Sequence, residues 1–207
     1  MRPALMIETL AIACSALSII VVFGVRTWLH RRRTGDAGWR GFRVGAGPAE
    51  RLGTILFALG LVTAVAAPVL VLTTGPDPLL EPGPIAVAVG LALWATGTIS
   101  AFGAQATMGR SWRIGVDPDE RSDLVAEGMF RWVRNPIFVA MILTQTGIVV
   151  LVPTVVAIAG LALVVAAIQI QVRLVEEPYL RAMHGAAYER YQREVGRFIP
   201  RAATRAS

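Results

Sequence analysis

Residues 137–170 read IFVAMILTQTGIVVLVPTVVAIAGLALVVAAIQI, an apolar run that contains no charged side chain. A transmembrane helix needs about 20 apolar residues, so this run is too long for one span and short for two. Pro153 interrupts it near the middle, and only uncharged residues flank this proline. The run therefore predicts a tight hairpin of two transmembrane helices whose tip lies in or near the membrane interface.

Three other apolar segments precede the hairpin, at residues 5–25, 52–73 and 84–106. The first is followed by Arg31, Arg32 and Arg33 instead of the small residues of a signal-peptide cleavage site, so we expect it to be retained as a membrane anchor. Residues 74–78 form a turn signal after the second segment, and Pro84 suits the start of the third. The sequence therefore predicts an all-α, polytopic membrane protein with about five transmembrane helices.

The composition of the whole chain agrees with a membrane location. Hydrophobic residues make up 55% of its 207 residues and charged residues only 16%, whereas soluble domains carry about 25% charged residues. The single cysteine, Cys14, excludes an internal disulfide and a cysteine-rich metal site. His30 and His184 are far apart in the sequence and fit no metal-ligand spacing, so we expect no metal site.

The arginines are concentrated in three segments. Residues 26–51, 110–134 and 173–205 hold seven, five and seven of the 20 arginines, and residues 74–83 and the Pro153 turn hold none. Cytoplasmic flanks of membrane helices are enriched in arginine, which predicts an outside N-terminus and a cytoplasmic C-terminus. The same bias explains the net charge of +6 through contacts with anionic lipid headgroups, without nucleic acid. Arginine as the sole basic residue type, with abundant Ala, Val and Gly, indicates a bacterial inner membrane.

Three polar segments lie on the predicted cytoplasmic side of the hairpin: residues 128–136 (GMFRWVRNP), 173–180 (RLVEEPYL) and 188–200 (YERYQREVGRFIP). In the first, Asn135 precedes Pro136 and is in position to cap a helix, whose free N–H groups favour an anionic group. Arg131 and Arg134 are three residues apart, so they are expected to share a helical face.

The second polar segment carries the adjacent carboxylates of Glu176 and Glu177 at a membrane boundary, where they need cations nearby. Arg173 and Arg181 lie four residues on either side of Glu177, a spacing that predicts ion pairs on a helix surface. Pro178 favours an extended conformation for Glu177, which predicts a kink or break at this position.

The third polar segment predicts an amphipathic cytoplasmic helix. Tyr188, Tyr191 and Val195 share one helical face, and such a helix is expected to lie on the lipid headgroups.

Polar residues inside the first three spans are few. Glu8 stands near the outer end of the first span, where a carboxylate reaches water, and Gln105 near the inner end of the third, where it is expected to join helices.

In order, the chain shows R-x-x-R-N-P at a helix start, a hairpin, E-E-P-x-L, Y-x-x-Y and R-F-I-P, preceded by G-R-S-W-R-I-G at residues 109–115. Over residues 108–200 this order resembles the isoprenylcysteine carboxyl methyltransferase and phospholipid methyltransferase family of integral membrane enzymes. The resemblance implies S-adenosylmethionine as a cofactor that enters from the cytoplasm, and a lipophilic substrate that arrives laterally from the membrane. The methyl acceptor would be an isoprenoid acid or thiol, a lipid amine or a phenol.

The family pattern assigns roles to residues of this sequence. Glu176 and Glu177 match its paired glutamates, where a carboxylate would bind the cofactor's ammonium group or ribose hydroxyls. Arg197 matches its C-terminal arginine and would orient an anionic substrate, since a guanidinium pairs bidentately with a carboxylate. We therefore expect Glu177 and Arg197 to be catalytic residues. The expected cofactor-binding residues are Gly128, Arg134, Asn135, Pro136, Phe138, Glu176, Glu177, Tyr188 and Tyr191.

The sequence departs from the family pattern at several positions. Asn135 replaces the usual histidine; it forms hydrogen bonds but does not titrate near neutrality. Phe138 replaces a tyrosine, so a hydroxyl is lost, and Ala140 replaces a glycine, which narrows any close approach of helices. A catalytic role of the histidine position therefore does not transfer to this chain.

Two other functions stay open. Membrane sterol and steroid reductases share a related C-terminal hairpin and bind NADPH, and Asn135-Pro136 resembles their N-P-Y motif, but the paired glutamates and the Y-x-x-Y spacing favour the methyltransferases. A membrane scaffold or transporter subunit is the other alternative. Transporters usually carry polar or ionisable residues at mid-membrane, and these spans are nearly free of them, which disfavours this alternative. Under the methyltransferase interpretation, residues 1–107 are a three-span scaffold, residues 108–200 the methyltransferase-like region and residues 201–207 a tail.

Overall fold

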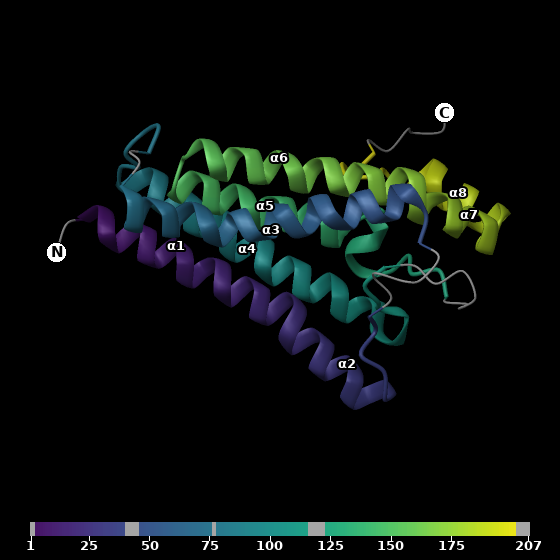
Figure 1. Cartoon of the computed structure of the whole chain (residues 1–207). Coiled ribbons are helices and arrows are strands. Elements are labelled where there is room, and N and C mark those ends of the chain that lie inside the picture. Colours follow the sequence, from purple (N-terminus) through teal and green to yellow (C-terminus); the bar gives the residue numbers. More distant parts are fainter. Residues whose placement is uncertain (1–2, 40–45, 76–77, 116–122, 202–207) are drawn as a thin grey trace.

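The computed structural model describes residues 3–39, 46–75, 78–115 and 123–201 of the chain. These residues form helices and loops without a β-strand, which confirms the predicted all-α fold (Figure 1). The helical elements are α1 (Pro3–Ile19), a π-helical segment (Ile20–Val25), α2 (Arg26–Thr34), α3 (Pro48–Thr74), α4 (Pro84–Met108), two 3₁₀ turns (Gly109–Ser111 and Gly128–Arg131), α5 (Pro136–Leu151), α6 (Val155–Ile170), a second π-helical segment (Gln171–Glu176), α7 (Glu177–His184) and α8 (Ala186–Glu194).

The apolar helices are long enough to make this an integral membrane protein. Within the described residues, four helices have the length and composition to cross a bilayer: Leu5–Thr34, Pro48–Thr74, Pro84–Ser111 and Val155–His184. A further apolar helix, α5, has 16 residues, which gives about 24 Å at 1.5 Å per residue. Pro153 lies in the short turn between α5 and α6, and the Thr154 hydroxyl oxygen caps α6 by accepting a 3.1 Å bond from the Ala157 N–H. The predicted hairpin is confirmed.

The long helices alternate in direction, so their connections gather at two opposite ends of the molecule (Figure 1). One end holds the start of α1, the connection between α3 and α4, and Pro153. The other end holds α2, the connection between α4 and α5, and α7 with α8, and all the arginines that the structure describes belong to these segments or adjoin them. Part of the predicted tail and five arginines lie outside the described residues: Arg2, Arg40, Arg43, Arg121 and Arg205. That the arginine-rich end faces the cytoplasm stays a prediction.

Small residues allow two pairs of helices to approach closely. At Gly97 of α4, an added Cβ would lie 2.5 Å from the backbone nitrogen of Thr144 in α5. At Gly60 of α3, an added Cβ would lie 2.5 Å from the side chain of Val164 in α6. In lipid, where apolar side chains gain little by leaving the solvent, such close backbone packing drives helix association. The closely packed pairs α4–α5 and α3–α6 therefore form the frame of the fold.

Polar side chains attach α1 to this frame. The hydroxyls of Ser18 and Thr98 lie 2.9 Å apart, and the indole N–H of Trp94 donates to Ser18 Oγ over 2.7 Å. Ser15 Oγ donates to the carbonyl of Ala64 in α3 over 3.0 Å. Glu8 is only 5% exposed, so the expectation that it reaches water is wrong: α1 turns this face towards the protein interior.

The second π-helical segment joins α6 to α7, and the three form one continuous helix. Glu177 is helical, with φ −64° and ψ −42°, so the break predicted at Pro178 is wrong. The irregularity is instead the wider π turn just before the proline, which accommodates a residue without an N–H donor. The same turn brings Gln171 Nε2 within 3.5 Å of Glu176 Oε1, five residues further along.

Candidate active site

The C-terminal segment folds back onto the start of α5. The backbone N–H of Arg134 donates to the Gly196 carbonyl over 2.8 Å, and that of Asn135 to the Arg197 carbonyl over 3.2 Å. The side-chain amide of Asn135 also donates to the Arg197 carbonyl, over 3.1 Å. Asn135 therefore occupies the N-cap position of α5, but its side chain holds the C-terminal segment instead of capping the helix. Two motifs that are 62 residues apart in sequence thus become neighbours.

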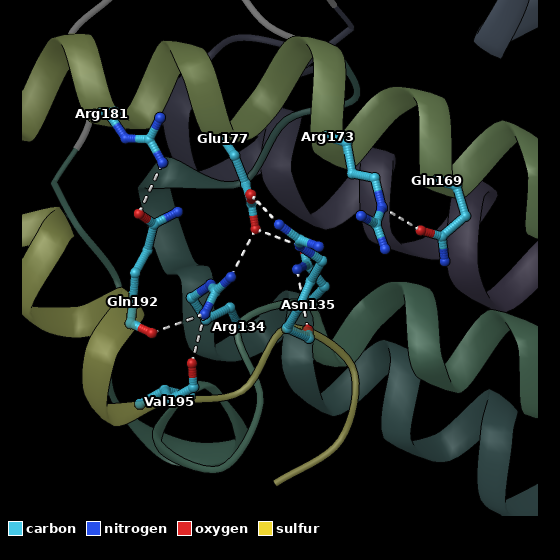
Figure 2. Close-up of polar contacts among 9 residues, drawn as sticks. Arg134, Asn135, Gln169, Arg173, Glu177, Arg181, Gln192 and Val195 are labelled. Carbon is cyan, nitrogen blue, oxygen red and sulfur yellow. Dashed lines mark hydrogen bonds and ion pairs between the residues drawn. The ribbon is translucent and has the colours of Figure 1, made fainter. Parts of the chain in front are cut away.

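Glu177 stands between two guanidinium groups (Figure 2). Arg134 Nη2 donates to Glu177 Oε1 over 2.8 Å, while Arg197 binds bidentately through Nε and Nη2, each 2.7 Å from a carboxylate oxygen. The side chains of Arg134 and Glu177 are each 7% exposed, and that of Arg197 is 30% exposed. Its hydrogen bonds to Glu177 raise the pKa of Arg197. The network joins α5, α7 and the C-terminal segment.

Arg173 and Arg181 do not form the helix-surface pairs with Glu177 that their spacing predicts. Arg173 Nε donates to Gln169 Oε1 over 2.6 Å, and Arg181 Nη2 to Gln192 Oε1 over 3.1 Å (Figure 2). The π turn changes the angular separation between residues 173 and 177, and Glu177 points towards α5. The prediction identified the right carboxylate but the wrong cations.

The aromatic face of α8 packs on the protein. Tyr188 is 1% exposed, and Tyr191 and Val195 are each 8% exposed. The Tyr191 hydroxyl donates to the Phe130 carbonyl over 2.6 Å, which fixes the turn before α5. Burial raises the pKa of both tyrosines, so both hydroxyls keep their protons. The amphipathic helix is confirmed, whereas the expectation that its apolar face rests on headgroups is wrong, because Leu124 and Leu180 cover that face.

Beside the Glu177 network lies a cavity of about 360 Å³. Along α3 its lining changes from Glu50 in the first turn to Phe57 and Leu61 further along the helix. Along α5 it changes from Asn135 at the start to Met141. The cavity therefore has a polar end near the arginine-rich loops and an apolar end inside the helix bundle.

Most of the expected site residues meet in this cavity. Those that line it are Arg134, Asn135, Pro136, Phe138, Glu176, Glu177, Tyr188 and Tyr191. Gly128 is absent from the described lining. Its φ of +55°, and the 3.0 Å that would separate an added Cβ from the Thr107 side chain, explain why glycine is needed in this turn. Arg197 is also absent from that lining and is connected to the cavity wall through Glu177 and, by its carbonyl, through Asn135.

Part of the polar lining was missed by reasoning from the sequence. Glu50 from α3, Gln105 from α4, and Arg113 and Asp123 from the loop between α4 and α5 contribute to it. A carboxylate in the first turn of a membrane helix, as at Glu50, was a usable signal. The first three spans thus supply part of the cavity wall as well as support.

Residues 85–187 match a family model described as phospholipid methyltransferase. The chain belongs to this family of membrane methyltransferases. The match begins at α4, covers the α5–α6 hairpin and both glutamates, and ends in α8. No curated protein matches the chain.

Membership of the phospholipid methyltransferase family implies a methyltransferase that acts on membrane lipids. The family segment supplies Gln105, Arg134 and Glu177 to the cavity, whereas Glu50 precedes it and Tyr188 follows it. The cavity is therefore completed by residues on both sides of the matched segment.

Proposed function

We propose that the protein transfers a methyl group from S-adenosylmethionine to a lipophilic substrate bound in the cavity. The observation that carries this proposal is the cavity itself, with a polar, carboxylate-rich end and an apolar end among the membrane helices. The polar end suits a soluble cofactor, and the apolar end suits the hydrocarbon part of a membrane molecule.

The charge balance of the lining supports a cationic cofactor. Among the described lining residues, the Asp, Glu and Arg side chains are four carboxylates and two guanidiniums: Glu50, Asp123, Glu176, Glu177, Arg113 and Arg134. Glu177 is bonded to Arg134 and Arg197, so it is not free to bind a further cation. The other lining carboxylates, Glu50, Asp123 and Glu176, still outnumber the other lining guanidinium, Arg113. S-adenosylmethionine carries a sulfonium, an ammonium and a carboxylate group, and acidic surroundings favour its net positive charge. NADPH carries several phosphate charges, which the same surroundings disfavour, so the charge balance does not support the reductase alternative.

Glu176 is the carboxylate that we assign to the cofactor. It lines the cavity, and its one described hydrogen bond, from Gln171, is long at 3.5 Å. Its oxygens therefore keep capacity for the cofactor's ammonium group or ribose hydroxyls. Glu177, by contrast, accepts three short bonds from Arg134 and Arg197. We assign Glu177 and Arg197 the task of holding the site together.

When bound, S-adenosylmethionine supplies a methyl group already activated on a sulfonium. The protein then has to bring donor and acceptor into line and to exclude water, which is catalysis by positioning. In this proposal Arg134 and Asn135 fix the polar wall through their bonds to the C-terminal segment. Phe138 and Met141 provide the apolar wall for the acceptor's hydrocarbon chain.

Thermal unfolding of the purified protein with each cofactor tests the proposal. We expect S-adenosylmethionine and S-adenosylhomocysteine to raise Tm in a concentration-dependent way, because a ligand that binds only the folded state stabilises it. NADPH is expected to leave Tm unchanged. A rise in Tm with NADPH and none with either adenosyl compound would overturn the assignment.

A further inference from the structure

Two buried oxygens in the cavity have no hydrogen-bond partner among the residues that the structure describes: Gln105 Oε1 and Glu50 Oε1. Gln105 is 2% exposed, so water does not reach its amide freely. Both residues line the cavity. Leaving such an acceptor unsatisfied destabilises the folded protein, and more strongly for a charged group. Native structures rarely keep two of them in one cavity without a ligand or an ordered water.

The two acceptors come from the part of the chain that the motifs do not cover. Glu50 lies in the first turn of α3 and Gln105 in the last turn of α4, so both stand at the loop end of their helices. Arg134, two residues before α5, and Glu177, the first residue of α7, supply another part of the same wall and bind each other. The Glu50 and Gln105 oxygens are therefore left to recognise something that enters the cavity.

We propose that Glu50 and Gln105 form an acceptor subsite, which binds a hydrogen-bond-donating group of the molecule held in the cavity. A carboxylate and an amide oxygen both accept hydrogen bonds, and the carboxylate adds attraction for a positive charge. The subsite therefore takes an ammonium group best and a hydroxyl group next. It rejects a carboxylate, because the negative charges of Glu50 and of the ligand would repel each other and neither group would have a proton to donate in a hydrogen bond.

The role of this subsite rests on the proposed function, but the binding experiment that tests the subsite does not. The donor group belongs either to S-adenosylmethionine, which carries ammonium, amino and hydroxyl groups, or to the head of the methyl acceptor. Direct binding of simple probes separates these two sources and does not require methyl transfer.

The binding experiment uses the full chain in detergent. Trp39 and Trp112 line the cavity, so their fluorescence reports its occupation. The probes are dodecylamine, dodecanol and dodecanoate, which share one apolar chain and differ in the head, and S-adenosylmethionine. We expect the wild-type protein to bind dodecylamine at least tenfold more tightly than dodecanoate, with dodecanol between them.

Two nearly isosteric substitutions remove the acceptor properties one at a time. Glu50→Gln keeps a neutral acceptor but removes the charge, so it should weaken dodecylamine binding about tenfold and dodecanol binding much less. Gln105→Leu removes the amide oxygen, so it should weaken both donors. The matched controls are Glu81→Gln, at an exposed position near the opposite end of the bundle, and Gln145→Leu, which is 5% exposed and outside the described cavity lining.

Each outcome of these binding experiments either supports or overturns the subsite. Weaker binding of dodecylamine in both variants supports the subsite and assigns it to the methyl acceptor. Weaker binding of S-adenosylmethionine alone supports the subsite and assigns it to the cofactor. Equal binding of dodecylamine and dodecanoate, with no effect of either variant on any probe, overturns it. If the wild-type protein fails to bind S-adenosylmethionine but discriminates between the alkyl probes as described, the proposed function fails and the subsite stands.

Discussion

Arg134, just before α5, and Glu177, at the start of α7, form an ion pair of 2.8 Å, and both side chains are 7% exposed. Two charges at this depth are tolerated because each has several partners: Glu177 also binds Arg197, and Arg134 donates to the carbonyl groups of Gln192 and Val195. The pair therefore joins the hairpin to the C-terminal segment, next to the cavity.

Glu177→Gln should destabilise the fold. Removing one partner of a buried pair leaves its cations uncompensated and typically costs about 3–5 kcal/mol. We expect a clear fall in Tm, measured by circular dichroism in detergent. Glu127→Gln, the same substitution at an exposed position, is the control and should leave Tm unchanged. A Tm for Glu177→Gln equal to that of the control would contradict the structural role of the network.

Glu176→Gln should act on the cofactor instead. A hydrogen bond to a charged group contributes about 1.5–3 kcal/mol, so the affinity for S-adenosylmethionine should fall roughly ten- to a hundredfold. Because Glu176 has only one long hydrogen bond within the described structure, Tm without ligand should change little. Isothermal titration calorimetry measures the affinity, and an unchanged Kd would remove Glu176 from the cofactor site.

Tyr191→Phe should loosen the turn before α5. The substitution deletes the 2.6 Å bond from the Tyr191 hydroxyl to the Phe130 carbonyl and leaves that buried carbonyl without this donor. A loss of about 1–2 kcal/mol is expected. Amide hydrogen exchange should rise in the Gly128–Arg131 turn more than in α3. Equal exchange in both segments would show that the hydroxyl does not anchor the turn.

Gly97→Ala should push α4 away from α5. The new Cβ would lie 2.5 Å from the Thr144 backbone nitrogen, and relieving such overpacking costs about 1–3 kcal/mol. Gly24→Ala is the matched control, since an added Cβ there meets nothing within 4 Å. Thermal unfolding compares the two, and a larger loss of stability at Gly24 would contradict the close packing of α4 on α5.

The membrane helices could be predicted from the sequence because their signal is local. An apolar run broken once by Pro153 has few other solutions in lipid, where each backbone polar group must be bonded within its own segment. The arginine-rich end of the molecule could also be predicted from the sequence. Each arginine-rich segment adjoins a helix end, and counting the spans places these helix ends on the same side. The phospholipid methyltransferase segment, residues 85–187, begins earlier than the motif-based boundary at residue 108.

The details of the site could not be predicted because they depend on contacts between distant segments. The pairing of Glu177 with Arg197 follows from the return of residues 195–197 to the start of α5, which helical spacing does not encode. The helical state of Glu177 follows from the π turn before Pro178, an irregularity without a reliable sequence signal. Glu50 precedes the apolar segment predicted for residues 52–73, and only the structure places it in the cavity wall.

The central claim is that the cavity brings S-adenosylmethionine and a membrane molecule together for methyl transfer. The most direct test incubates the purified protein, in vesicles made from a bacterial total lipid extract, with S-adenosylmethionine labelled in its methyl group, and counts label in the organic phase. We predict time-dependent labelling of lipid that falls at least tenfold in Glu176→Gln. Absence of label in lipid above that from protein-free vesicles, under conditions in which the protein is folded and binds S-adenosylmethionine, would contradict the account.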